Sequence, residues 1–296
     1  MKAGFVALVG RPNAGKSTLL NRFVGEKVAI VSDKPQTTRH RIVGVRNVKA
    51  GQIVFVDTPG IHKPLHRMNR RMVDAATDAL KQSDVVVLVV DASGRPGGGD
   101  AFVVDMLKEA GVRPILALNK VDRVDKHGLL PLIDHYSRAL DCRAIVPVSA
   151  LKGEGVDALE AELVGALPDG EPLYPEDYLT DQTERSLASE LIREKVLHHT
   201  RDELPFTTAV VIDQFEEPAT PGALTKIYAS ILVDHDSQKP IVIGKGGDMI
   251  KRIGTEARLD LERMLGGRVH LDLHVKVRSD WRDDERLLDE LGLRKR

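Results

Sequence analysis

A glycine-rich segment near the N-terminus has the residue types and spacing of a phosphate-binding loop. Residues 10–17 read GRPNAGKS, which fits the pattern G-x-x-x-x-G-K-[ST] between a predicted strand and a predicted helix. The glycines let backbone N–H groups turn toward phosphate oxygens, and the N-terminus of the following helix adds partial positive charge. We therefore expect Lys16 to reach the β- and γ-phosphates of a nucleotide, and the Ser17 hydroxyl to bind Mg²⁺.

A second short motif follows another predicted strand, at Ile53–Val56. It reads Asp57-Thr58-Pro59-Gly60. A carboxylate in this place can hold Mg²⁺ through a water molecule, and the N–H of Gly60 can reach a γ-phosphate. The pattern D-x-x-G is weak by itself, but its position behind the phosphate-binding loop makes it specific.

Two further motifs could recognise a base. Residues 119–122 read NKVD after the predicted strand Ile115–Leu118, and Ser149-Ala150-Leu151 follows Ala144–Val148. The Asp122 carboxylate can accept two bonds from guanine, whereas adenine would leave that carboxylate unpaired, which favours guanine by a factor on the order of 10⁴. We expect Asn119 to support the loop, the Lys120 stem to cover the ring, and the Ala150 N–H to bind guanine O6.

The C-terminal half carries an independent signal. Residues 242–253 read VIGKGGDMIKRI, which fits I-G-x-x-G-x-x-I-x-x-I, the signature of KH domains. Such a G-x-x-G loop packs against the backbone of about four nucleotides of single-stranded nucleic acid. We expect an apolar groove beside it, formed by the three isoleucines of this run, one of which is Ile253. The expected RNA contacts are Ile243, Gly244, Lys245, Gly246, Gly247, Ile250, Lys251 and Arg252.

The elements that must position the first three motifs are buried strands alternating with helices. Apolar runs without polar alternation occur at Gly4–Val9, Ile53–Val56, Val85–Val90, Ile115–Leu118 and Ala144–Val148. Strands of this kind are buried on both faces, so the pattern predicts a mostly parallel sheet covered by helices on each side. The fold class expected here is α/β.

The pattern changes after a proline-rich break. Prolines 168, 172 and 175 interrupt any apolar period, so we expect a first domain over 1–170, a linker over 171–182 and a second domain over 183–296. The second domain has a helical stripe over 182–200, strands over 207–215 and 224–233, and an alternating strand over 269–277. We therefore expect a smaller α+β domain with an open sheet. Trp281 should pack the last helix onto it.

Composition excludes several classes of protein. The net charge is -1, from 43 Lys and Arg against 44 Asp and Glu, so a strongly basic nucleic-acid binder is excluded. Basicity is local instead: residues 239–278 carry 9 basic against 5 acidic side chains, which suits a short single-stranded target. The longest aliphatic run, Val85–Val90, is too short to cross a membrane. A single cysteine, Cys142, fits a reducing cytoplasmic compartment.

The four N-terminal motifs, in this order over residues 1–151, resemble the translation-factor-related GTPases. The resemblance implies a Ras-like GTP-binding domain with a six-stranded sheet, in which one antiparallel strand joins the parallel ones. It places switch I at Asp33–His40 and makes Thr38, or alternatively Thr37, the magnesium-binding threonine. The nucleotide contacts it implies are Gly10, Asn13, Ala14, Gly15, Lys16, Ser17, Thr18, Asp57, Gly60, Asn119, Lys120, Asp122, Ser149, Ala150 and Leu151. Catalysis would fall to Lys16, Thr38 and Gly60, and metal binding to Ser17, Thr38 and, through water, Asp57.

One position departs from the Ras pattern. The residue after Gly60 is Ile61, where Ras-type enzymes have a glutamine that orients water. We therefore expect slow intrinsic hydrolysis, or activation by a partner or an ion. In the branch of the family that lacks the glutamine, an asparagine at the position of Asn13 can help to hold K⁺. The alternative, in which Asn13 only shapes the loop, stays open.

The combination of one such GTPase domain with a prokaryotic-type KH domain closely resembles the Era family of bacterial GTPases, over essentially the whole chain. The resemblance implies a ribosome assembly factor that binds the single-stranded 3′ end of 16S rRNA during maturation of the 30S subunit, with RNA binding gated by GTP and GDP. It also implies a cytoplasmic protein with some peripheral association with the inner membrane face. Two other classes stay open: a P-loop ATPase or kinase, and a non-catalytic RNA-binding scaffold.

Overall fold

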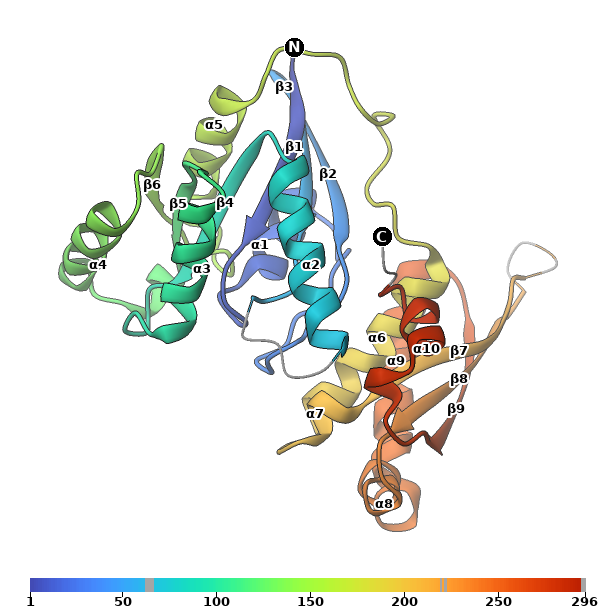
Figure 1. Ribbon diagram of the computed structural model, residues 1–296. Coiled ribbons are helices and arrows are strands. Elements are labelled where there is room, and N and C mark those ends of the chain that lie inside the picture. The colour runs from blue at the N-terminus through green and yellow to red at the C-terminus, as the bar shows by residue number, and fades with distance from the viewer. Residues whose placement is uncertain (62–66, 219, 221–222, 294–296) are drawn as a thin grey trace. The chain divides into compact units, whose positions relative to one another are not determined.

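The computed structural model describes residues 1–61, 67–218, 220 and 223–293. These residues form two compact units: most of residues 1–181 make up the first, and the chain from Gln182 onward makes up most of the second (Figure 1). Across the described residues, no helix has both the length and the apolar character needed to cross a membrane.

The first unit contains a six-stranded sheet with the strand order β2-β3-β1-β4-β5-β6. Only β2 runs antiparallel to its neighbour, and the other pairs are parallel. This confirms the predicted Ras-like sheet. The strands are β1 (Lys2–Val9), β2 (Ile42–Val48), β3 (Gly51–Asp57), β4 (Val85–Asp91), β5 (Ile115–Asn119) and β6 (Ala144–Pro147).

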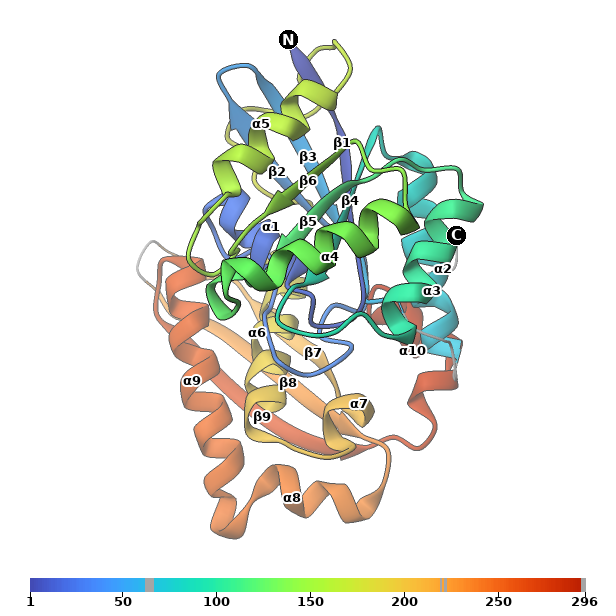
Figure 2. The ribbon, with the colours of Figure 1, turned by 90° about the vertical axis from the view of Figure 1, so that its left-hand side faces the viewer.

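Helices cover both faces of this sheet, as the uninterrupted apolar runs predict. The side chains of β4 show why: Val85, Val87 and Val89 face one apolar core, whereas its alternate residues face another. The first core includes α1 (Lys16–Val24) and α5 (Val156–Ala166). The second includes α2 (Arg67–Gln82), α3 (Gly98–Glu109) and α4 (Lys126–Ala139) (Figure 2).

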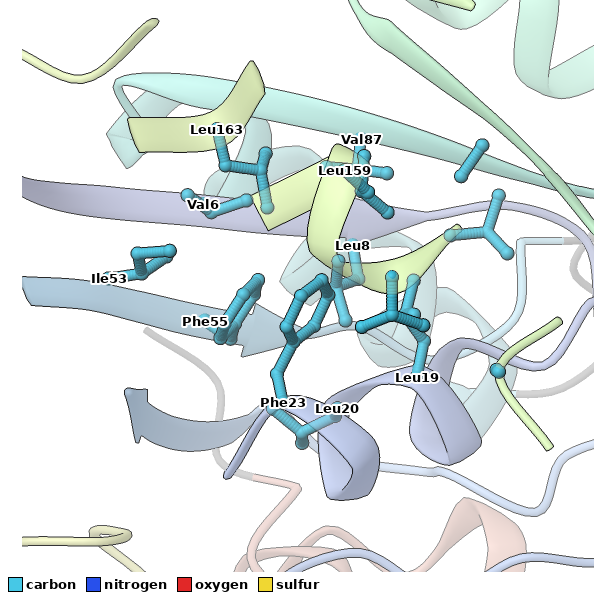
Figure 3. Packing of buried hydrophobic residues seen from close by; sticks show 14 of the residues in the cluster. Val6, Leu8, Leu19, Leu20, Phe23, Ile53, Phe55, Val87, Leu159 and Leu163 are labelled. Atoms are coloured by element: carbon cyan, nitrogen blue, oxygen red, sulfur yellow. The ribbon is translucent and has the colours of Figure 1, made fainter. Parts of the chain in front are cut away.

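The core beside α1 fixes the helix that follows the phosphate-binding loop. Figure 3 shows Phe23 of α1 against Phe55 of β3, and their rings stack with centroids 4.6 Å apart. Leu19 and Leu20 of the same helix are also fully buried. Each such side chain stabilises the fold by about 1.5–3 kcal/mol relative to exposure, so the N-terminus of α1 is held firmly at the end of β1.

The predicted linker contains a segment that packs along the edge strand β2. We call residues 173–181 the strap. The Val45 N–H donates to Leu179 O (2.9 Å), and the Thr180 hydroxyl donates to Val43 O (2.6 Å). Tyr174 and Tyr178 stack with ring centroids 4.8 Å apart and lie against the small apolar cluster of β2 and β3. The strap therefore belongs to the first unit and covers polar groups of a sheet edge. The domain boundaries inferred from the sequence stay a prediction.

The second unit is an α+β domain with the sheet order β7-β8-β9. β7 and β8 are antiparallel, whereas β8 and β9 are parallel, with the G-x-x-G loop between them in sequence. This is the KH topology expected from the sequence, and Figure 2 shows its helices beside the strands. Its elements are α6 (Glu184–His199), α7 (Leu204–Thr207), β7 (Ala209–Glu216), β8 (Thr225–Val233), α8 (Lys239–Ile243), α9 (Asp248–Leu265), β9 (Val269–Val277) and α10 (Glu285–Glu290).

Two local details of this unit refine the expectations from the sequence. The strand expected from residue 207 begins only at Ala209, because the preceding turn is the short helix α7. Trp281 is fully buried, and its indole N–H donates to Thr207 O at 2.8 Å. Its buried polar atom is thus satisfied, as a tryptophan in a core requires.

Candidate nucleotide and nucleic-acid sites

The phosphate-binding loop joins β1 to α1 and requires glycine where other segments of the chain come close. A Cβ on Gly10 would lie 2.3 Å from Val89 O, and one on Gly15 would lie 2.2 Å from Asn119 Nδ2. Gly15 also has a φ of 96°, and Asn13 has a φ of 63°, in a region that asparagine tolerates better than most residues. The backbone of the loop therefore packs closely against residues of β4 and β5, at positions where a side chain would collide. Ala14 is buried, and Thr18 lies in the first turn of α1.

Lys16 is buried within this loop. Its ammonium donates to Gly10 O and Arg11 O, both at 3.2 Å. Burial lowers the pKa of Lys16, and the nearby Asp57 carboxylate opposes that shift. A poorly solvated cation with only carbonyl partners in the loop would be stabilised by phosphate oxygens, which fits the role expected for Lys16.

Three oxygen-bearing side chains meet beside Lys16. The Ser17 hydroxyl lies 2.6 Å from Asp57 Oδ2 and 2.7 Å from the Thr38 hydroxyl. Thr38 and Asp57 are both buried. Of the two candidate threonines, the structure thus places Thr38 in the cluster. The strongest effect on Asp57 is burial, which raises the pKa of its carboxyl group; Lys16 and the two hydroxyl groups oppose this.

This cluster fits a magnesium ion. Asp57 Oδ1 is buried and has no hydrogen-bond partner among the described residues. All three side chains offer oxygen atoms, which Mg²⁺ prefers as ligands. In octahedral Mg²⁺ sites the metal–oxygen bonds are about 2.1 Å long, so neighbouring ligand oxygens lie about 3 Å apart. The oxygen–oxygen distances of 2.6 and 2.7 Å in the cluster are close to that spacing. The Ser17 and Thr38 hydroxyl groups could ligate Mg²⁺ directly and Asp57 could do so through water. Positive charge here would also compensate the buried carboxylate.

Gly60 and Ile61 occupy different environments. A Cβ on Gly60 would lie 2.7 Å from Pro12 Cα, so the backbone of the D-x-x-G motif packs on the phosphate-binding loop. Ile61, by contrast, is 1% exposed and lies in the core that contains α2, α3 and α4. Its side chain is committed to packing and has no group that could orient water.

The two base-recognition motifs are joined by Asn119. Its side-chain amide donates to Ala14 O (2.8 Å), and its carbonyl oxygen accepts from the Ala150 N–H (3.0 Å). Ser149 Oγ lies 2.5 Å from Asp122 Oδ1, and this contact orients the carboxylate. The structure therefore brings NKVD and Ser149-Ala150-Leu151 together as expected. One detail differs: the Ala150 N–H assigned to guanine O6 donates to Asn119 here.

Two residues outside the motifs contact these loops. Asp91, the last residue of β4, forms an ion pair with Lys120 at 2.6 Å. Arg22 of α1 donates from Nε to Ala150 O at 3.1 Å and from Nη2 to Leu151 O. A signal for Asp91 exists in the sequence, since it ends a buried strand parallel to the others. Nothing in the sequence distinguishes Arg22 from other exposed helical residues.

The G-x-x-G loop connects α8 to α9. Gly244, Gly246 and Gly247 have φ values of 78°, 63° and 85°, which favour glycine. Lys245 is exposed between them. A Cβ on Gly244 would lie 2.7 Å from Met249 N, whereas one on Gly246 would meet nothing within 4 Å. The loop thus presents Lys245 and an open backbone at Gly246.

The side chains around this loop separate into exposed and buried groups. Lys251 and Arg252 are exposed on α9, and Ile243 and Ile250 are partly exposed. Ile253 is fully buried in the core of the unit. The expectation that Ile253 lines the groove is therefore wrong. Ile253 lies on the same buried face of α9 as Ala257 and Leu261, and this face packs into the core.

Two family models match the chain in the order of the two units. One, described as a 50S ribosome-binding GTPase, matches residues 5–120. The other, described as a KH domain, matches residues 203–282. Together they agree with the two sites built above.

Relatives match over nearly the whole chain. GTPase Era of Geobacter metallireducens is 50% identical over 98% of this chain and 97% of its own length. That of Syntrophus aciditrophicus is 48% identical over 98% and 95%. Two solved structures, a variant of Aquifex aeolicus Era bound to GDP and AlF4⁻ and Era in complex with MgGDPNP and nucleotides 1506–1542 of 16S ribosomal RNA, each have a TM-score of 0.95 at 41% identity, with 100% of both chains covered. The chain therefore belongs to the Era family of GTPases.

Proposed function

We propose that this GTPase binds the single-stranded 3′ end of 16S rRNA through its KH domain and aids maturation of the 30S subunit, with RNA binding gated by GTP and GDP. The observation that carries the proposal is the solved complex of Era with MgGDPNP and nucleotides 1506–1542 of 16S ribosomal RNA, which this chain resembles along its full length. Residues suited to both sites of such a complex support the proposal for this chain.

At the nucleotide end, the assignments follow from geometry and charge. Lys16 and the N-terminus of α1 would bind phosphate oxygens, while Ser17, Thr38 and Asp57 would hold Mg²⁺. Mg²⁺ would neutralise charge that develops on the phosphates. Asp122, oriented by Ser149, would select guanine. Because Ile61 lies in the core, it cannot orient water. Our candidate for activating hydrolysis is K⁺ held with the help of Asn13, which would supply positive charge to the transition state.

At the RNA end, Lys245, Lys251 and Arg252 would contact phosphates, and the glycines would allow close approach of the backbone. Ile243 and Ile250 are partly exposed and would pack against unstacked bases. Within the second unit, residues 239–278 carry a local excess of basic residues, 9 against 5 acidic ones, which supports a short single strand over a long duplex.

Gating requires that the protein bind RNA with different affinities in its GTP-bound and GDP-bound states. Thr38 lies just before β2, and Gly60 lies just after β3. Both residues contact or approach the phosphate-binding loop. A γ-phosphate would order them, and hydrolysis would release them. A clean switch needs a difference of about 5 kcal/mol between the two states.

The test is RNA binding measured in both nucleotide states. We expect a fluorescent oligonucleotide with the 3′-terminal sequence of 16S rRNA to bind tightly with GDPNP and weakly with GDP. Equal affinity in the two states would exclude gating. No binding in either state would exclude the RNA function altogether, and uptake of ATP in place of GTP would exclude the assigned base recognition.

Variants of the loop locate the interface. Gly244→Asp deforms the loop because of Met249, so Gly246→Asp is the better probe: it adds negative charge where there is space, at a backbone cost of about 1–2 kcal/mol. We expect Gly246→Asp and Lys245→Ala to weaken RNA binding and to leave GTP hydrolysis unchanged. Lys226→Ala, an exposed lysine of β8 in the same domain, is the matched control. Crosslinking to RNA in cells should likewise decrease in Gly246→Asp and Lys245→Ala and stay unchanged in Lys226→Ala.

The proposal also includes a cytoplasmic location with peripheral association with the inner membrane face. Flotation of the purified protein with anionic and neutral vesicles tests the second part. Recovery of the protein only in the unbound fraction would exclude it.

A further inference from the structure

The two loops that recognise the base are each fastened by a side chain outside the four motifs. We propose that Asp91 and Arg22 are positioning residues of the guanine site, and that they set nucleotide affinity and base discrimination without taking part in hydrolysis. The inference rests on the nucleotide-binding role proposed above for the NKVD and Ser149-Ala150-Leu151 loops.

Asp91 orients Lys120. One carboxylate oxygen pairs with the Lys120 ammonium at 2.6 Å, and that ammonium also donates to Asn13 O at 2.7 Å. The other oxygen accepts from the N–H and the hydroxyl of Ser93, at 3.0 and 2.6 Å. The carboxylate is thus fixed at both ends, and the ion-paired side chains of Asp91 and Lys120 are only 14% and 23% exposed.

The backbone of Lys120 shows why such a tether matters. Its φ is 66°, a left-handed conformation that costs about 1–2 kcal/mol in a residue other than glycine. Strain of this kind persists only where surrounding contacts hold it. The contacts of the Lys120 ammonium with Asp91 and Asn13 supply that hold, two residues before Asp122 in the same motif.

Arg22 performs the same task for the other loop. Its guanidinium donates to the carbonyls of Ala150 and Leu151, two consecutive residues of the motif. Arg22 lies on α1, six residues after Lys16, which corresponds to about 9 Å along the helix. The helix that begins at the phosphate site therefore also fixes the position of the base site. Leu151 stays 58% exposed, so core packing does not fix its side chain.

These contacts can be removed without harming the phosphate site. Leu151 is exposed, so its carbonyl can bond to water when Arg22 is absent, whereas Ala150 is buried. Lys16, Ser17, Thr38 and Asp57 contact neither Arg22 nor Asp91 through any hydrogen bond or ion pair found among the described residues. Loss of either tether should therefore affect the placement of the base and spare the chemistry at the γ-phosphate.

The experiment compares Arg22→Gln and Asp91→Ala with the unchanged full chain. We expect dissociation of a fluorescent guanosine diphosphate to accelerate about tenfold in each variant, since a charge-assisted hydrogen bond is lost. The preference for GTP over inosine triphosphate, which lacks the 2-amino group, should fall. Single-turnover hydrolysis of bound GTP should stay within twofold of its original rate.

Conservative variants distinguish positioning from folding. Arg22→Lys can still donate, and Asp91→Asn can still accept from Lys120, so each should recover part of the lost affinity. The matched controls are Arg138→Gln and Asp134→Asn, an exposed pair on α4, which should change nothing.

Three results would overturn the inference. The first is a rate of guanosine diphosphate dissociation that stays within twofold of the original in both variants. The second is a rate of GTP hydrolysis that falls in parallel with nucleotide affinity. The third is an unchanged preference for GTP over inosine triphosphate. If Arg22→Gln or Asp91→Ala does not fold, the same three criteria apply to Arg22→Met and Asp91→Ser, which also remove the charged contact. Failure of the unchanged chain to bind guanine nucleotides would instead refute the proposed function of the loops.

Discussion

Removal of the Gln52 side chain should release the strap from the first unit. Gln52 lies in β3 and is fully buried. Its carbonyl oxygen accepts from the N–H groups of Leu173 and Tyr174, at 2.7 and 2.9 Å, and its amide donates to Tyr174 O at 2.8 Å. One glutamine thus satisfies three backbone groups at the start of the strap, and Gln52→Ala removes all three contacts.

The size of the effect follows from those three bonds. Each contributes about 1 kcal/mol net, so the docked strap should lose about 3 kcal/mol in the variant. This loss of free energy affects only the equilibrium between the docked and the detached strap. A detached strap regains hydrogen bonds with water, and the strands of the sheet stay paired. A difference of about 3 kcal/mol corresponds to a factor of about 100 in the opening equilibrium.

Hydrogen exchange measured by mass spectrometry tests this directly. In Gln52→Ala, peptides covering 173–181 should exchange up to about 100-fold faster, whereas peptides from β1 and β4 should keep their protection. Gln82→Ala, an exposed glutamine of the same unit, is the control. Unchanged exchange in the strap, or an equal increase throughout the unit, would refute the reasoning.

Three further predictions concern other parts of the chain. Hydrolysis of GTP should be faster in K⁺ than in Na⁺, and Asn13→Gly, which tolerates the positive φ, should remove that difference; equal rates in the two salts exclude the K⁺ role. Because burial raises the pKa of Asp57, ionisation of this carboxyl group destabilises the nucleotide-free fold as pH rises from the ordinary value of about 3.8 through the raised pKa. Nucleotide-free Asp57→Asn should therefore melt above the unchanged protein at pH 7, by a margin that shrinks at acid pH, and Mg²⁺ should not stabilise it. Trp281→Phe leaves Thr207 O buried without its donor, and urea denaturation followed by circular dichroism should show a loss of about 1–3 kcal/mol in the second unit; a smaller loss would mean that water replaces the indole.

The fold class and the candidate site residues could both be predicted from local patterns in the amino-acid sequence, and the structure confirms the fold class. Each motif of the first unit follows a buried strand, and the carboxyl ends of parallel strands meet at one edge of the sheet. Lys16, Asp57 and Asn119 therefore had to converge once the strands were recognised. Local signals sufficed because the chemistry lies in short contiguous segments, and the G-x-x-G loop followed from glycine and isoleucine spacing in the same way.

Contacts between segments that are far apart in the sequence could not be predicted in this way. The burial of Ile253, the choice of Thr38 for the oxygen cluster, and the docking of the strap on β2 each depend on which surfaces meet. Arg22 reaches a loop 128 residues away in the chain, and no periodicity or motif marks such a pair. Spacing in the sequence records what a segment can do locally, whereas its partners are fixed by the packing of α1 and the strands against one another.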